Sequence, residues 1–305
     1  MINKNIIIGS GMSAYIYYKD TIDKVKIYSG NNNRILKSRN LYEYDTIGGN
    51  SNIWGGYINY RRHKKLSKNN KYKNFFKKNY LKVNKIFKIS SNFSNTHCIM
   101  DAKDEVFRVK KNFFQGNLIE ENINNVQVEK NNILLWGKKK KIITKNLILC
   151  IGNLNLINLL YKSKFINSYD IISFDDANCN YVLNFFINKK KNYYIPMPVF
   201  KILEKMIFSK STTYKISNDS LILQKFSNIV KTHKFSCEDL LKMNKSKLRY
   251  FLSNHVVNLR VNNVPIRKFI NSKSRKIKVF CSGTIKKYLP GPVIQDLIYD
   301  ILNNK

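Results

Sequence analysis

The amino-acid sequence predicts an α/β fold whose sheet is assembled from both ends of the chain. Near the N-terminus, an apolar strand at 5–8, a helix at 12–19 and a second strand at 24–28 occupy about thirty residues, the size of one β-α-β unit. Near the C-terminus, a strand at 276–280 precedes a helix at 292–302 that opens with proline, which is favoured in the first helical turn. Strands that alternate with helices in this way indicate a sheet covered by helices.

The N-terminal unit carries a glycine motif between its first strand and its helix. Residues 9–14 read Gly-Ser-Gly-Met-Ser-Ala, which fits the pattern G-x-G-x-x-A. Gly9 permits a tight turn, Gly11 lets the backbone approach a pyrophosphate, and Ala14 allows the helix to pack closely on the strand. The helix N-terminus adds N–H groups and a positive dipole end. The motif therefore predicts dinucleotide binding, and the alternative is a glycine turn without a ligand.

The end of the second strand lacks the acidic residue that usually accompanies this motif. Ser29 stands there, 29 − 9 = 20 residues after the first glycine. A serine hydroxyl can hydrogen-bond a ribose hydroxyl, but it lacks the strength that the charge of a carboxylate adds. We therefore expect Ser29 to be a weaker ribose ligand than the usual carboxylate.

A second glycine-rich segment follows at 48–56, with the sequence GGNSNIWGG. Its two Gly-Gly pairs would let the backbone lie flat against a ligand while the indole of Trp54 closes one side. The alternative is a glycine loop packed under a core tryptophan.

The elements in the middle of the chain complete the predicted sheet. The lysine-rich stretch 61–88 has apolar residues at helical spacing, which predicts a helix with its lysines in solvent. Strands are predicted at 125–128, 133–136 and 141–150, joined by short turns. The last of them ends in a run, 147–151, that is apolar on both faces, as expected of a buried parallel strand.

That strand ends at Gly152, and an apolar helix is predicted at 154–161. Residues 165–250 carry mixed strand and helix signals, and Pro196 and Pro198 indicate a turn or a sheet edge. No proline-, glycine- or serine-rich linker divides the chain. The sequence is thus read as one large domain or two closely packed ones.

The composition supports a folded protein with a substantial core. The chain has 305 residues, of which 43% are hydrophobic, and it includes 18 Phe and 19 Tyr. Disordered chains combine high net charge with few aromatic residues, so this abundance of aromatic residues argues against disorder.

The charge is strongly basic. Lys and Arg number 55 against 19 Asp and Glu, a formal net charge of +36. Such a surface suits nucleic acid or an anionic membrane. Lysine greatly outnumbers arginine, however, and the bidentate contacts of nucleic-acid recognition favour arginine. Nucleic acid is therefore the less favoured partner, and peripheral contact with a membrane stays open.

The five cysteines are odd in number and widely separated, with no C-x-x-C pair. They predict neither a disulfide framework nor a metal site. The apolar run before Gly9 is too short for a signal peptide or a membrane span. We therefore expect a cytoplasmic location.

Several motifs in order resemble the glucose–methanol–choline (GMC) oxidoreductases. They are the G-x-G-x-x-A start, the GGNSNIWGG segment, the strand end Cys150-Ile151-Gly152, and the C-terminal stretch 278–297. The family consists of FAD-dependent enzymes that oxidise alcohols and sugars. The resemblance covers about residues 1–60, 125–160 and 250–305.

The resemblance implies a Rossmann-type FAD-binding domain at 1–164 and 251–305, with a smaller α+β substrate domain inserted at 165–250. It assigns the pyrophosphate to Gly9, Ser10, Gly11 and Ala14, the adenosine ribose to Ser29, and the adenine edge to Val128. It assigns the flavin's inner side to Gly49, Ser51, Trp54 and Gly55, and the adenosine portion to Gly152. It assigns the ribityl-phosphate region to Ser282 and Gly283, and the start of a helix aimed at the isoalloxazine to Pro292.

Alcohol oxidation by a flavin needs a base for the hydroxyl proton, and a histidine ordinarily serves in the family. The segment from Asn254 to Arg260 resembles the family's H-x-x-G-x-x-R, which makes His255 the implied base. The alternative is a half-buried structural histidine. The second catalytic position, an Asn or His just before the helix proline, is Gly291 in this chain, so one hydrogen bond to the substrate oxygen is lost.

The favoured hypothesis is thus an FAD-dependent oxidoreductase that transfers a hydride from an alcohol or sugar substrate to flavin N5. One alternative is a basic protein that binds nucleic acid or an anionic membrane. Another is a degenerate flavoprotein whose FAD is not redox-active. The basic cluster around His63 could attract an anionic substrate, or it could be a solvated helix face.

Overall fold

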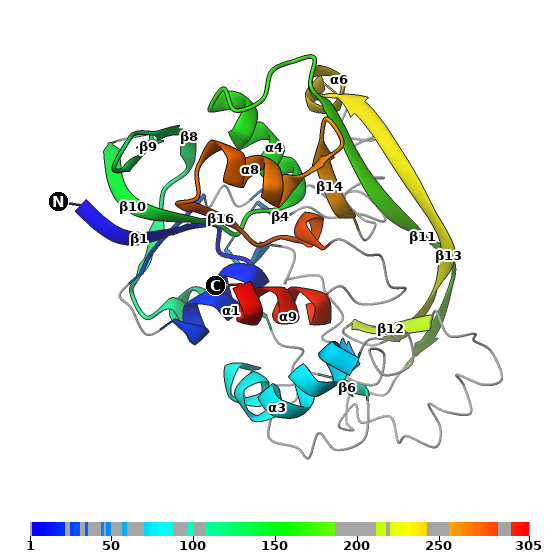
Figure 1. Cartoon of the computed structure of the whole chain (residues 1–305). Helices are drawn as coiled ribbons and strands as arrows, with labels where there is room; N and C mark the ends of the chain where they lie inside the picture. The colour runs from blue at the N-terminus through cyan, green and yellow to red at the C-terminus, as the bar shows by residue number, and fades with distance from the viewer. Residues whose placement is uncertain are drawn as a thin grey trace.

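The computed structural model describes most of the chain. The described residues are 2–21, 25–30, 34–35, 44–45, 47–49, 57–59, 70–87, 97–99, 108–138, 140–186, 212–217, 220–242, 256–285 and 294–304. They form a largely parallel sheet with helices on both faces and a second, antiparallel sheet beside it (Figure 1). The predicted α/β class is confirmed.

The first sheet has seven strands, and its centre is parallel. Strand β1 pairs with β2 on one side and with β10 on the other, β7 extends the sheet beyond β2, and β16 pairs with β10. The bounds are β1 (Ile2–Ile8), β2 (Lys26–Ser29), β7 (Leu118–Glu120), β10 (Lys141–Leu149) and β16 (Ile277–Val279). An antiparallel hairpin, β8 (Ile123–Val128) and β9 (Ile133–Gly137), pairs with the first half of β10.

The side chains of β1 alternate between the two faces of the sheet, and each face has its own hydrophobic core. Ile6 and Ile8 are buried on one face of the sheet, and Ile7 is buried on the other. Successive side chains of a strand point to opposite faces, so a run of isoleucines with no polar residue between them requires cover on both sides. The apolar run predicted to be a buried parallel strand, which ends β10, is buried in the same way.

The helices α1 (Met12–Asp20), α3 (Asn70–Phe87) and α9 (Ile294–Asn304) cover the Ile7 face, together with the 3-10 turn η2 (Lys111–Phe114). Tyr15 joins α1 to α3, because its hydroxyl donates to the carbonyl of Ile86 at 2.5 Å. Phe75 of α3 packs edge-on against Tyr299 of α9, with ring centroids 4.8 Å apart. The predicted helix in the lysine-rich stretch is thus present from Asn70 onward.

The other face is covered by α4 (Asn153–Lys162), α6 (Cys237–Lys242) and α8 (Ile266–Lys273), and by the second sheet. That sheet has the order β12-β13-β11-β14-β15, with two long central strands that run side by side (Figure 1). Its bounds are β11 (Ile171–Phe186), β12 (Thr212–Ser217), β13 (Ser220–Ser236), β14 (Val257–Val261) and β15 (Val264–Pro265). Two short ladders, β3 (Arg34–Ile35) with β4 (Tyr44–Asp45) and β5 (Tyr57–Asn59) with β6 (His97–Ile99), complete the described strands.

The second sheet combines segments from both predicted domains. Strand β14 pairs with β11 through Ile172 opposite Val261 and Ser173 opposite Arg260. The division at residues 164 and 251 stays a prediction.

Within the described residues, no helix is long and apolar enough to cross a membrane.

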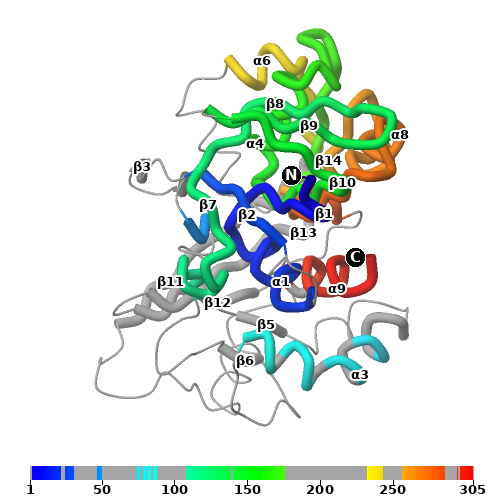
Figure 2. Tube along the Cα trace, turned by 90° about the vertical axis from the view of Figure 1, so that its left-hand side faces the viewer, coloured from blue at the N-terminus to red at the C-terminus, as the bar shows by residue number. Residues whose placement is uncertain are grey.

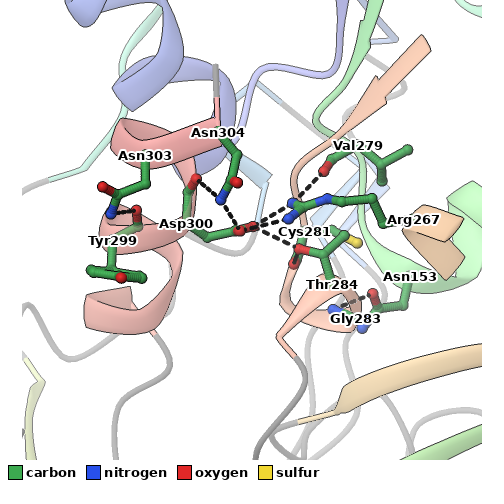
Figure 3. Close-up of polar contacts among 10 residues, drawn as sticks. All are labelled: Asn153, Arg267, Val279, Cys281, Gly283, Thr284, Tyr299, Asp300, Asn303 and Asn304. Atoms are coloured by element: carbon green, nitrogen blue, oxygen red, sulfur yellow. Dashed lines mark hydrogen bonds and ion pairs between the residues drawn. The ribbon is translucent and has the colours of Figure 1, made fainter. Parts of the chain in front are cut away.

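An ion pair ties α9 to α8 and the sheet. The guanidinium of Arg267 donates to both carboxylate oxygens of Asp300, at 2.7 and 2.5 Å, and to the carbonyl of Val279 at 2.9 Å (Figure 3). The hydroxyl of Thr284 lies 2.9 Å from the same carboxylate. Both charged side chains are mostly buried, and each supplies the counter-charge of the other.

Replacing Asp300 with Asn should destabilise the protein by about 2–3 kcal/mol, because Arg267 would keep its buried charge without a counter-charge. Urea unfolding would measure the change. The control is Glu238→Gln, which breaks the exposed pair of Glu238 with Lys242 and should leave the unfolding midpoint unchanged. Equal effects of the two substitutions would show that the Arg267 pair does not hold α9.

Candidate functional site

The carboxyl ends of β1 and β10 form the candidate site. From β1 the chain passes through α1 to β2 on one side, whereas β10 and the strand beyond it, β16, lie on the other side. Connections that diverge from adjacent parallel strands leave a crevice outside the strand ends, where open α/β sheets bind ligands. The glycine motif follows β1, and Gly152 follows β10.

Gly9 makes the turn out of β1 with a backbone that only glycine adopts readily. Its φ is +107°, and a Cβ atom there would lie 2.4 Å from the carbonyl oxygen of Cys150. Its N–H donates to the carbonyl of Tyr28 at 2.8 Å, and the N–H of Cys150 donates to the carbonyl of Ile8, also at 2.8 Å. The turn is therefore held against the ends of both neighbouring strands.

Gly11 is the N-cap residue directly before α1, and it has no side chain that could cap the helix. Among the residues that the structure describes, no side chain caps this end of the helix, so its first N–H groups can meet an anion. The N–H of Gly48 donates to the carbonyl of Ser10 at 3.1 Å, and Gly48 and Gly49 both have positive φ. The structure thus places the start of the second glycine-rich segment directly against the first.

Ser10 and Ser29 form a buried pair beside this turn. Their hydroxyl oxygens are 2.7 Å apart, and either can be the donor. Ser29 ends β2, as the sequence predicts, but its hydroxyl is engaged by Ser10 and also contacts the carbonyl of Gly30 at 3.2 Å. A ribose at this position would therefore meet a neutral hydroxyl pair.

The neighbouring strand β7 brings carboxylates to the end of β2. Ser29 lies opposite Glu120 in the parallel register, and the ammonium of Lys111 donates to a carboxylate oxygen of Glu120 at 2.5 Å. Glu121 lies close enough to Tyr28 that its charge, added to the larger effect of burial, raises the pKa of the phenol. The sequence analysis missed both acids because they stand 120 − 29 = 91 and 121 − 29 = 92 residues after Ser29.

Asn153, the first residue of α4, joins the end of β10 to the segment that follows β16. Its amide donates to the hydroxyl of Ser282 at 2.9 Å, and its carbonyl oxygen accepts from the N–H of Gly283 at 3.0 Å (Figure 3 draws the Gly283 contact). A Cβ on Gly283 would lie 2.5 Å from that Asn153 oxygen. Ser282 and Gly283 are thus brought to the helix that follows Gly152.

The thiols of Cys150 and Cys281, near these strand ends, are unreactive at neutral pH. Burial raises the pKa of the Cys281 thiol to about 11, although the N–H groups of Gly283 and Thr284 oppose the change. Burial raises the pKa of the Cys150 thiol well above its ordinary value, and the nearby Cys281 adds to this effect. Both remain protonated near neutral pH, so neither supplies a thiolate nucleophile.

The remaining predicted site residues differ in how far the structure describes them. Ala14 is fully buried where α1 packs on the sheet, and Val128 ends β8, half-buried against the core. Several predicted residues lie outside the described residues: Ser51, Trp54, Gly55, His63, His255, Gly291 and Pro292.

The strand after His255 carries a polar cluster that sequence reasoning did not identify. Asp175 of β11 accepts from Arg260 at 2.8 Å, from Asn258 at 2.7 Å and from Thr232 at 2.9 Å. Asn258 has a φ of +54°, the conformation that favours glycine, at the position of the glycine in the motif resembled. Its N–H donates to the carbonyl of Ile285 at 2.8 Å, which joins β14 to the segment after Gly283.

No protein-family model matches the sequence, and no curated protein matches it significantly. Among solved structures, the chain is similar to the Diels-Alderase PyrE3 of pyrroindomycin biosynthesis, with 10% identity and a TM-score of 0.45 over 99% of this chain and 64% of that one. It is also similar to CabE, an aromatic hydroxylase from angucycline biosynthesis, with 10% identity and a TM-score of 0.43 over 99% and 61%. The halogenase PltM gives 11% identity and a TM-score of 0.35 over 98% and 67%. At these scores the likeness does not place the chain in a family.

Gly9→Ala should destabilise the protein by at least about 2 kcal/mol, because the new methyl group adds a backbone collision to the cost of positive φ. Gly116→Ala separates the two contributions: Gly116 also has positive φ, but a Cβ there meets no atom within 4 Å. Gly116→Ala should lower the free energy of unfolding by only about 1 kcal/mol. Equal losses in urea unfolding would show that the contact with Cys150 does not constrain the turn.

Proposed function

We propose that the chain is an FAD-dependent oxidoreductase that oxidises an alcohol. The observation that carries the proposal is the turn at Gly9, which lies where the sheet's connections diverge and leads into an uncapped helix N-terminus. The bond from Gly48 to Ser10 supports it, since it joins the two glycine-rich segments that the GMC resemblance assigns to one cofactor.

The residues present fit the diphosphate of such a cofactor. Gly9 and Gly11 carry no side chain that would block approach, and the N-terminal N–H groups of α1 would bind the negative oxygens. The ribose would bind near the Ser10–Ser29 pair, next to the end of β7, where Glu120 lies opposite Ser29 in the strand register. FAD bound there would accept the hydride that leaves the alcohol carbon.

The protein's part in the reaction is to bind the alcohol and remove its hydroxyl proton. We assign the proton to an imidazole nitrogen of His255, which directly precedes the described segment at Val256. The cluster of Asp175, Arg260 and Asn258 would hold that segment in place through β14. These three residues position the strand and do not themselves transfer the proton.

A second candidate is a flavoprotein whose FAD is not redox-active. Two observations favour it: Gly291 replaces the second hydrogen-bonding residue of the resembled site, and the neutral Ser10–Ser29 pair replaces a carboxylate at the ribose. The basic-protein alternative needs no cofactor at all.

The visible absorption spectrum of the purified protein tests the cofactor. We expect flavin bands that migrate with the protein, or that appear after FAD is added, together with a rise in melting temperature, since a ligand that binds only the folded state stabilises it. A panel of primary alcohols, aldoses and choline should then be screened for bleaching of these bands. The proposal would be refuted if the protein stays colourless and its melting temperature does not change when FAD is added.

His255→Ala should slow substrate-driven flavin reduction by about 10²- to 10⁴-fold while FAD content stays constant. His97→Ala serves as a matched control, and it should reduce flavin at the wild-type rate. If His255→Ala is as fast as wild type, His255 is not the base. If FAD binds but no alcohol in the panel bleaches the wild-type protein, the non-redox candidate is favoured.

A further inference from the structure

The outer face of α3 carries a stripe of lysines with an exposed leucine at its centre. Lys78, Leu81, Lys82 and Lys85 are spaced three, one and three residues apart, so they lie along one side of the helix. All four are exposed, and Leu81 is 66% exposed. We call these four residues the α3 stripe.

The rest of the helix fixes which way the stripe points. Val83, Ile86 and Phe87 are buried in the core beneath α1 and α9. Lys82 adds an ion pair with Asp20, at the end of α1. The stripe therefore lies on the exposed side of α3, away from the core. The helix itself lies at the end of the molecule opposite the β8–β9 hairpin (Figures 1 and 2).

The charge of α3 has one sign only. The helix contains six lysines and no aspartate or glutamate. An ordinary solvated helix mixes signs, because acidic and basic residues one turn apart stabilise each other. Leu81 lies exposed among these lysines, so its apolar surface is available for burial against a partner.

We propose that the α3 stripe docks the protein on an anionic phospholipid surface. Lys78 and Lys85 would meet lipid phosphates, and Leu81 would enter the boundary between headgroups and acyl chains, whereas Lys82 stays paired with Asp20. The net charge of +36 adds long-range attraction to the same surface.

Nucleic acid fits the stripe less well than lipid does. Proteins that bind single strands stack bases on aromatic rings or on arginine, and the four residues of the stripe include neither. An aliphatic side chain among lysines suits a lipid boundary instead, where apolar insertion and charge act together. This proposal does not depend on the proposed oxidoreductase function.

Sedimentation with vesicles tests the proposal on the full chain. Vesicles of phosphatidylcholine with about one third phosphatidylglycerol should bind the protein, pure phosphatidylcholine should not, and binding should weaken as salt rises. Lys78→Gln with Lys85→Gln should weaken binding about 25-fold, since each lysine near an anionic surface contributes a factor of about five. Lys82 is kept in this variant because it pairs with Asp20.

Two further variants distinguish binding through the α3 stripe from attraction by the net positive charge of the whole protein. Leu81→Ser should weaken vesicle binding about tenfold at unchanged net charge. Lys138→Gln with Lys140→Gln removes the same charge from the β9–β10 turn and should change binding less than about threefold. Circular dichroism of each variant checks that the fold is kept.

The proposal is overturned if the two double variants weaken binding equally, or if anionic vesicles fail to bind the wild-type protein. It is also overturned if Leu81→Ser binds as wild type does. Tighter binding to a single-stranded oligonucleotide than to anionic vesicles at the same salt, unaffected by Leu81→Ser, would identify nucleic acid as the partner instead.

Discussion

The contact between Gly9 and the backbone of Cys150 is the constraint on which the rest of the structure depends. It closes the end of β1 onto the end of β10 and starts α1 at the same point. Because β1 is paired on both sides and buries Ile7 opposite Ile6 and Ile8, the helices on both faces hold the strand in one register. A slip of one residue would exchange the two cores and move the turn away from the helix N-terminus.

The candidate site is therefore assembled from segments that are far apart in the chain. Ser10 meets Ser29 and Gly48, whereas Asn153 meets Ser282 and Gly283 at the other strand end. Each of these contacts is short and polar, and each stabilises the site only after the sheet has aligned its partners. Long-range pairing of this kind gives a site whose geometry depends on the whole sheet.

Local patterns were sufficient to predict the elements around the site. The helix after Gly11, the buried strand that ends near Cys150 and the helix after Gly152 follow from apolar spacing and from glycine at the turns. The Ser10–Ser29 bond, the approach of Glu121 to Tyr28 and the cluster at Asp175 depend on which strands lie side by side. The pairing of β2 with β7 and of β11 with β14 has no local signature in the sequence, so these features could not be predicted from it.

The divided pairing of β10 has a consequence for how the protein is made. Its first half pairs with β9, which follows β8 directly in the chain, but its second half pairs with β16, more than a hundred residues later. During synthesis, the backbone groups of Leu147, Ile148 and Leu149 remain an open apolar edge until residues 277–279 leave the ribosome. Such an edge is a template for pairing with other chains, and β16 removes it when it pairs with β10.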